Sequence, residues 1–434
     1  MTNIWVICLI GLCIALLLWG LVKRDRVLQY PFFMGGIFLS FLVPQAIALT
    51  NNPSFVSPQA VDRILIHSCL CVAMCWLGYL FKPKLKWLAK INVPMDIRRL
   101  TQAAWVLVLF GRVCSFLLGQ ITIQTTGAGT WTGPATILLF FSQTSLIGAA
   151  ILLIVALGDR YRPWVNLLGV GIALWPTLFS VIEYGRRQPT ATVLIIIGLG
   201  LYFTRNITPP RWLVLGLVIL SASLIPLIGQ LRGGFWDALF TGNLAINDLR
   251  LAFNNLLEGQ TLELRNAALI AEAASRTNQY GYGTGFWNSI VFQYVPGQLV
   301  GYDVKEFLYI NLTNFSLTDL FGYDTPTGTT LTGVGDSFRE FSYFGCFIFA
   351  LIAYWFKNLW VAAVSFRSIY SQILYIGLVS PALVGLTHGI GRFLQEAIFQ
   401  VILITLVSRY ARQKNADPPQ WIAAQSTSEQ SLHQ

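Results

Sequence analysis

Leu231-Arg232-Gly233-Gly234 begins, and Asp336-Ser337-Phe338-Arg339-Glu340-Phe341-Ser342-Tyr343 ends, the longest hydrophilic stretch of this chain. On either side of residues 231–343 the sequence is a series of apolar segments joined by short polar loops. Segments of about 20 apolar residues match the hydrocarbon thickness of a bilayer. The sequence therefore predicts an all-α polytopic integral membrane protein with one large loop in water, and we expect any active site beneath this loop.

The composition agrees with a membrane protein, because 55% of the 434 residues are hydrophobic and only 11% are charged. A lipid-exposed backbone must satisfy its own hydrogen bonds, so each apolar segment is predicted to be a helix. We predict about eleven of them, at residues 4–22, 31–49, 64–81, 101–118, 135–157, 164–182, 190–204, 212–230, 344–364, 369–387 and 393–409. The first is interpreted as a retained helix, because no basic residue precedes it and no small-residue cleavage site follows before Lys23.

Basic residues predict the orientation, because cytoplasmic loops of membrane proteins are rich in Lys and Arg. Every second loop is basic, and the basic segments are Lys23–Arg26, Lys82–Arg99, Asp159–Arg162, Arg205–Arg211, Lys357 with Arg367, and Arg409–Lys414. This alternation predicts four parts: helices 1 to 8 in residues 1–230, an external or periplasmic loop in 231–343, helices 9 to 11 in 344–410, and a disordered cytoplasmic tail in 411–434.

The large loop is predicted to be mainly helical. Residues 247–275 have the spacing of an amphipathic helix, and Gly281-Tyr282-Gly283-Thr284-Gly285 is interpreted as a turn. Residues 286–299 are predicted to form an interfacial helix, because Trp287, Phe292 and Tyr294 suit the membrane boundary.

Several function classes are disfavoured by what the sequence lacks. It has no P-loop, no His-Glu-x-x-His and no dinucleotide fingerprint, and all seven cysteines fall in or beside apolar spans. Cys69, Cys71 and Cys75 near His67 could suggest a metal site, but they are better interpreted as small buried hydrophobes. The loop carries six basic and eleven acidic residues in a chain of net charge +10, so the basic charge belongs to the other loops and argues against nucleic acid.

Arginines occur where positive charge should be scarce, at the predicted external ends of helices. They are Arg186, Arg187, Arg232, Arg339 and Arg392, with Arg112 inside a helix on its outer half. An arginine in hydrocarbon is costly and is a candidate functional residue, although Arg186 and Arg187 could simply extend to headgroups and Arg112 could pair with Glu183 or Glu396. Guanidinium groups suit phosphates, so together these residues predict a pocket for a lipid-linked pyrophosphate.

The chain resembles the Wzy-type O-antigen polymerases, which polymerise oligosaccharide repeat units. The resemblance rests on Gly185-Arg186-Arg187, on Leu231-Arg232-Gly233, on Asp324-Thr325-Pro326-Thr327-Gly328, on Gly391-Arg392, and on Glu340-Phe341-Ser342-Tyr343-Phe344-Gly345. The last segment is similar to the family's Glu-x-Tyr-x-Asn-Phe-Gly signature, but it lacks the Asn and is one residue shorter.

The resemblance implies a GT-C-like membrane fold in the bacterial inner membrane, with its active face in the periplasm. It implies metal-independent, inverting glycosyl transfer from an undecaprenyl-diphosphate-linked oligosaccharide, without a cofactor and with a chain-length regulator and a flippase as further partners. Arg187, Arg232 and Arg392 are then expected to bind the diphosphate, with Arg112, Arg339 and Arg186 as weaker candidates. His388 or Glu340 is expected to orient or deprotonate the acceptor hydroxyl.

Two other functions remain open from the sequence. An O-antigen ligase shares the layout and the donor but transfers the polymer to lipid A core. A transporter is a different class, disfavoured because neither inverted repeats nor broken helices are evident.

Overall fold

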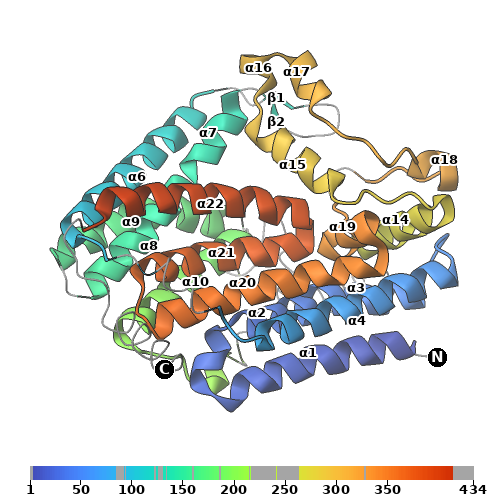
Figure 1. Ribbon diagram of the computed structural model, residues 1–434, viewed down its shortest axis with the longest axis horizontal. Coiled ribbons are helices and arrows are strands. Elements are labelled where there is room, and N and C mark those ends of the chain that lie inside the picture. Colours follow the sequence, from blue (N-terminus) through green and yellow to red (C-terminus); the bar gives the residue numbers. More distant parts are fainter. Residues whose placement is uncertain are drawn as a thin grey trace, which may run out of the picture.

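The computed structural model describes residues 3–84, 92, 94–121, 124–125, 131–132, 134–158, 161–184, 187–214, 216, 241, 263–326 and 329–413. Within these residues the chain is helical, apart from a hairpin of two-residue strands, β1 (Gln124–Thr125) and β2 (Trp131–Thr132). The long helices lie roughly along one direction and form a bundle, with the shorter helices α14 to α18 at one end of it (Figure 1).

Nine helical segments of the described chain are long and apolar enough to cross a membrane. They are α1 (Ile4–Val22), α2 and α3 (Tyr30–Asn51), α4 (Pro58–Leu80), α6 (Ile97–Leu118), α7 and α8 (Pro134–Leu157), α9 (Pro163–Ser180 of Pro163–Tyr184), α19 with α20 (Thr332–Val364), α21 (Ile369–His388) and α22 (Ile390–Ala411). The prediction of a polytopic, all-helical membrane protein is therefore confirmed.

The predicted count of eleven is matched in part. Residues 190–204 lie in a helix, α10 (Arg187–Arg205), but this helix is not among the nine. Its first turns contain Arg187, Gln188, Thr190 and Thr192, which make it less apolar than the others. Most of the predicted segment 212–230 lies outside the described residues.

The outer helices expose large apolar side chains. On α6, Val106, Leu109, Val113 and Phe116 are each more than half exposed. Such a surface is unfavourable in water and is expected against lipid. In contrast, α21 is buried along most of its length, so it lies at the centre of the bundle.

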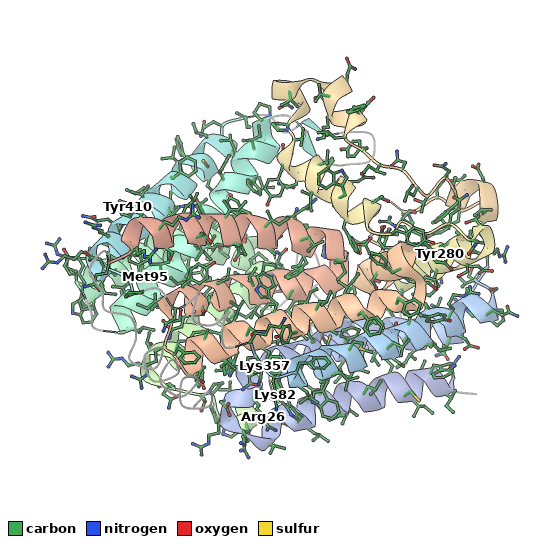
Figure 2. All side chains as sticks on the ribbon, in the orientation of Figure 1. Arg26, Lys82, Met95, Tyr280, Lys357 and Tyr410 are labelled. Carbon is green, nitrogen blue, oxygen red and sulfur yellow. The ribbon has the colours of Figure 1, made fainter. Side chains whose placement is uncertain are left out.

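The loops predicted to share one face do meet. Residues 94–96 pair with 411–413 through the bridge Met95–Arg412, and the guanidinium of Arg211 donates to the carbonyl oxygen of Val22 at 3.0 Å. The labelled Met95 and Tyr410 lie at the left of Figure 2, and Arg26, Lys82 and Lys357 at its lower centre, away from Tyr280 on the right. These labelled residues, which lie in or beside the basic segments, are therefore all away from Tyr280 in this view.

The large loop differs from its predicted outline in two places. The predicted interfacial helix over 286–299 is broken at Val295 and Pro296, which separate α15 (Thr284–Tyr294) from α16 (Gly297–Val300). Proline cannot continue the hydrogen-bonding of a helix and disfavours helical backbone in the residue before it. At its other end, the last turns of the predicted loop form α19 (Thr332–Phe341), which runs into the span through the short helix η3 (Ser342–Gly345).

Helices α4 and α20 (Cys346–Val364) pack closely against each other. A Cβ atom added to Gly78 would lie 2.2 Å from the carbonyl oxygen of Ala350, so only glycine permits this approach. Small residues at such contacts are a common feature of helix pairs in membranes.

We therefore expect Gly78→Val to destabilise the protein by about 2 kcal/mol or more, because the backbone of α20 must move away. The matched control is Gly11→Val, since nothing lies within 4 Å of a Cβ atom at Gly11. Unfolding in mixed detergent, followed by circular dichroism, compares the two variants. Equal stabilities would show that the α4–α20 contact is not close.

Candidate functional site

Four segments meet at the end of the bundle away from the basic loops. They are α19, the turn at residues 278–283, α15, and the first turn of α22. Tyr280, which marks the turn, is labelled at the right of Figure 2.

Three charged residues on one face of α19 form what we call the α19 cluster: Asp336, Arg339 and Glu340. Their spacing of three and four residues places them side by side on a helix. One terminal nitrogen of Arg339 donates to Asp336 Oδ1 at 2.9 Å, and its Nε donates to Glu340 Oε1 at 3.1 Å. The side chain of Glu340 is only 1% exposed. Buried carboxylates require such partners, because a lone buried charge is strongly unfavourable.

Glu340 also holds the glycine-rich turn. Its Oε2 accepts hydrogen bonds from the backbone N–H groups of Gly283 (2.9 Å) and Gly285 (3.1 Å). A Cβ atom at Gly281 or Gly285 would lie 2.2 Å from a carboxylate oxygen of Glu340. Gly283 has φ = +93°, a conformation that favours glycine. The turn predicted over residues 281–285 is present at 281–283, whereas Thr284 and Gly285 begin α15, and the glycines of this segment make room for Glu340.

Asp336 connects the cluster to α22. Its Oδ2 accepts the backbone N–H of Gly391 at 3.1 Å, in the first turn of that helix. A carboxylate at a helix N-terminus is stabilised by the unpaired N–H groups and the helix dipole. Asp336 thus fixes the start of α22, the helix that carries Arg392.

Arg392 is oriented but not enclosed. Its Nε pairs with Glu396 at 3.1 Å, and its side chain is 48% exposed. The two terminal nitrogens of a guanidinium group form an edge that suits a phosphate.

His388 ends α21 one turn before Arg392. The Thr387 hydroxyl donates to the carbonyl oxygen of Val384, so its oxygen can accept from His388 Nδ1 at 2.7 Å. This arrangement is compatible with a proton on Nδ1 and with Nε2 as the proton acceptor.

A cavity of about 400 Å³ lies between α15 and the α19 cluster. Its polar lining comes from four segments: Asn288 and Ser289 of α15, Asn311 and Thr313 after α17 (Tyr302–Phe307), Arg339 and Glu340 of α19, and Gln395 of α22. α15 is held to α22 on this side, because the Tyr294 hydroxyl donates to the carbonyl oxygen of Gln395 at 2.6 Å. Burial raises the pKa of Tyr294 to about 12, so its hydroxyl stays protonated.

A second cavity, of about 530 Å³, lies on the other side of Arg339. Its lining includes Thr313, Thr318, Tyr323 and Asp324. Arg339 therefore faces both cavities. A polar, hydroxyl-rich and amide-rich lining with one guanidinium is suited to sugars and to anionic groups rather than to an apolar ligand.

Four of the residues predicted for the site lie together here: Glu340, Arg339, His388 and Arg392. Arg112 is half-buried on α6, and its Nε has no hydrogen-bond partner in the described part of the chain. The alternative pairing of Arg112 with Glu396 is not found, since Glu396 pairs with Arg392. Arg187 begins α10 but its side chain is not described, and Arg186 and Arg232 lie outside the described residues.

The interpretation of Cys69, Cys71 and Cys75 as small buried hydrophobes agrees with the structure. Cys13, Cys69, Cys71, Cys75, Cys114 and Cys346 are buried as free thiols, and Cys8 is exposed on α1. His67 lies 3.5 Å from the Cys71 sulfur, but its Nε2 is closer to the Ser337 hydroxyl, at 3.0 Å. This contact anchors α19 to α4.

Comparison of the chain with protein-family models, with curated proteins and with solved structures finds no match.

Proposed function

We propose that this protein is a glycosyltransferase of the membrane that polymerises undecaprenyl-diphosphate-linked oligosaccharide repeat units, as the resemblance to Wzy-type polymerases implies. The observation that carries the proposal is a polar cavity beside α15 whose lining includes Gln395, three residues after Arg392 on α22, with His388 at the adjoining end of α21. A donor whose lipid lies in the bilayer presents its diphosphate and first sugar at this depth.

Arg392 is assigned to the diphosphate. The reaction places negative charge on the departing diphosphate, and fixed cations stabilise that charge in the transition state. The side chain of Arg392 is 48% exposed and has one carboxylate partner, Glu396, so it can also bind phosphate oxygens as partners. Arg339, in contrast, already faces two carboxylates, so it contributes less positive charge.

His388 is assigned to the acceptor. Its Nε2 would take the proton of the acceptor hydroxyl as that oxygen bonds to the anomeric carbon of the donor sugar. The bond from this carbon to the diphosphate oxygen breaks at the same time, and the diphosphate leaves with the electron pair. Glu340 is reassigned from acceptor activation to positioning, because both its oxygens are occupied by Arg339 and the glycine turn.

The test uses the purified protein in proteoliposomes with a synthetic undecaprenyl-diphosphate oligosaccharide. A ladder of products that differ by one repeat unit is expected. Polymer that forms only on added lipid A core would favour a ligase, and sugar movement across the bilayer with no new glycosidic bond would favour a transporter. Either result would overturn the proposal. In cells, deletion should remove long chains and leave single repeat units attached to the core.

His388→Ala is expected to lower kcat by about 100-fold, as removal of a general base does, with little change in the KM for the lipid donor. The variant should also lose the acidic limb of the pH–rate profile. His433→Ala, in the polar tail, is the matched control and should leave both unchanged. An unaltered profile in His388→Ala would assign proton transfer to another group.

A further inference from the structure

Residues 297–312, which we call the strap, carry exposed apolar side chains although they lie outside the nine candidate spans. Phe307 is 87% exposed, the highest value among the exposed large apolar side chains of the described chain. Five further large side chains of the strap are 45–62% exposed, namely Val300, Tyr302, Val304, Ile310 and Leu312. α17, in the middle of the strap, has no buried residue.

The backbone of the strap keeps these side chains outward. Gly301, with φ = +93°, separates α16 from α17 and lets the chain fold back. The Tyr302 ring then packs against Gly297, where a Cβ atom would lie 2.8 Å from it. The helices α16 and α17 are too short to bury their apolar side chains against each other. These side chains therefore need a partner outside the strap.

The strap is held at a defined position on α15. Trp287 Nε1 donates to the carbonyl oxygen of Leu308 at 2.9 Å, and Asn288 exchanges two hydrogen bonds with the backbone of Ile310, both 2.9 Å. Lys305 Nζ donates to the carbonyl oxygen of Phe292 at 3.0 Å and lies over the Phe292 ring. These hydrogen bonds fix the orientation of the strap relative to α15.

α15 in turn connects the strap to the lipid-facing rim of the bundle. The Tyr294 ring lies 5.7 Å from the ring of Phe140 on α7, and the neighbours Leu139 and Phe141 are exposed on that span. Figure 1 shows α16 and α17 beyond the end of α15, at the top outer edge of the molecule. The apolar surface of the strap thus continues the surface that the spans present to lipid.

We propose that the strap lies in the headgroup–acyl boundary of the bilayer, with Tyr302, Val304 and Phe307 inserted. Aromatic and aliphatic side chains on short interfacial helices bind there through buried apolar area. With Asp303, Glu306 and Lys305 the strap carries a net charge of −1, so its binding does not depend on anionic lipid. The last residues of the strap, Tyr309, Ile310 and Asn311, line the polar cavity, so the bilayer fixes one wall of the site.

The test places a spin label at position 307 of the full chain in phosphatidylcholine vesicles. Phe307→Cys is made with Cys8→Ser, because Cys8 is the one exposed cysteine of the seven. The ratio of collision rates with oxygen and with a water-soluble nickel complex reports depth. Val106→Cys, on the lipid face of α6, is the lipid reference, and Asp319→Cys, on the exposed helix α18 (Leu317–Phe321), is the aqueous reference.

The ratio at position 307 is expected to be at least about fivefold higher than at 319 and to approach that at 106. Val304→Cys should give the same result, which guards against a local effect of one substitution. A ratio like that at 319 would place the strap in water and overturn the proposal. A label shielded from both reagents would overturn it in favour of a protein partner or a second copy. The outcome is independent of the proposed chemistry, because it measures depth and not activity.

Discussion

Arg392→Ala is expected to lower polymer formation by about 10²–10³-fold, the loss that follows removal of one charge-stabilising donor from an active site. Normal insertion and stability are expected, because this side chain is half-exposed and its one described ion pair is with Glu396 on the same helix. Arg392→Lys should recover only part of the activity, because an ammonium lacks the planar fork that binds two phosphate oxygens. Initial rates in proteoliposomes measure both variants.

Arg409→Ala is the matched control for Arg392→Ala. Arg409 lies on the same helix in its last turn, exposed at the end of the bundle where the basic loops meet. Its replacement should leave the rate within twofold of the unmodified protein, roughly the scatter of independent surface substitutions. If Arg392→Ala retained full activity, or if both variants lost it equally, Arg392 could not be the ligand of the diphosphate.

The membrane architecture was predictable because it depends on local composition. An apolar segment long enough to span a bilayer is recognisable one segment at a time, which is why nine of the predicted segments coincide with long apolar helices. The basic loops were equally informative, since the contacts at Met95, Arg412 and Arg211 join segments that had been assigned to one face. The break at Pro296 was also readable from the sequence, but the apolar pattern over 286–299 was given more weight.

The location of the site was predictable from the sequence, but the hydrogen bonds and ion pairs that join its residues were not. Arg339, Glu340, His388 and Arg392 were selected because their charge or titration was unexpected near a membrane. Asp336 is a site residue that the sequence analysis does not predict, although its spacing to Arg339 is that of a helical ion pair. The spacing could have identified it, had α19 been recognised as a helix.

Contacts between distant segments could not be read from one sequence. The bonds from Gly283 and Gly285 to Glu340 span 57 and 55 residues. They change the interpretation of Glu340, because a carboxylate with this many donors is a structural partner and not a free base. Likewise, Ser289 and Gln395 come together only because α15 lies against α22, where Gln395 Nε2 donates to the Ser289 carbonyl oxygen at 2.5 Å.

Glu340→Ala is expected to destabilise the protein by about 3–5 kcal/mol, the effect of removing one partner from a buried ion pair. Three donors lose their acceptor together: the N–H groups of Gly283 and Gly285 and the Nε of Arg339. The turn before α15 is then no longer fixed to α19, so the polar cavity between them should be lost as well. Thermal unfolding in detergent measures the stability, and hydrogen exchange at residues 281–285 should rise.

A double-mutant cycle separates the ion pair from the glycine turn. If Arg339 and Glu340 stabilise each other, Arg339→Ala combined with Glu340→Ala should be less destabilising than the sum of the single variants by about 1 kcal/mol or more. The exposed Glu306→Ala is the control for loss of a carboxylate, and it should change stability by less than about 0.5 kcal/mol. If the stability changes of the two single variants simply add, Glu340 stabilises the protein only through its hydrogen bonds to the glycine turn. If the Glu340→Ala protein were as stable and as active as the unmodified protein, the α19 cluster would not organise the site.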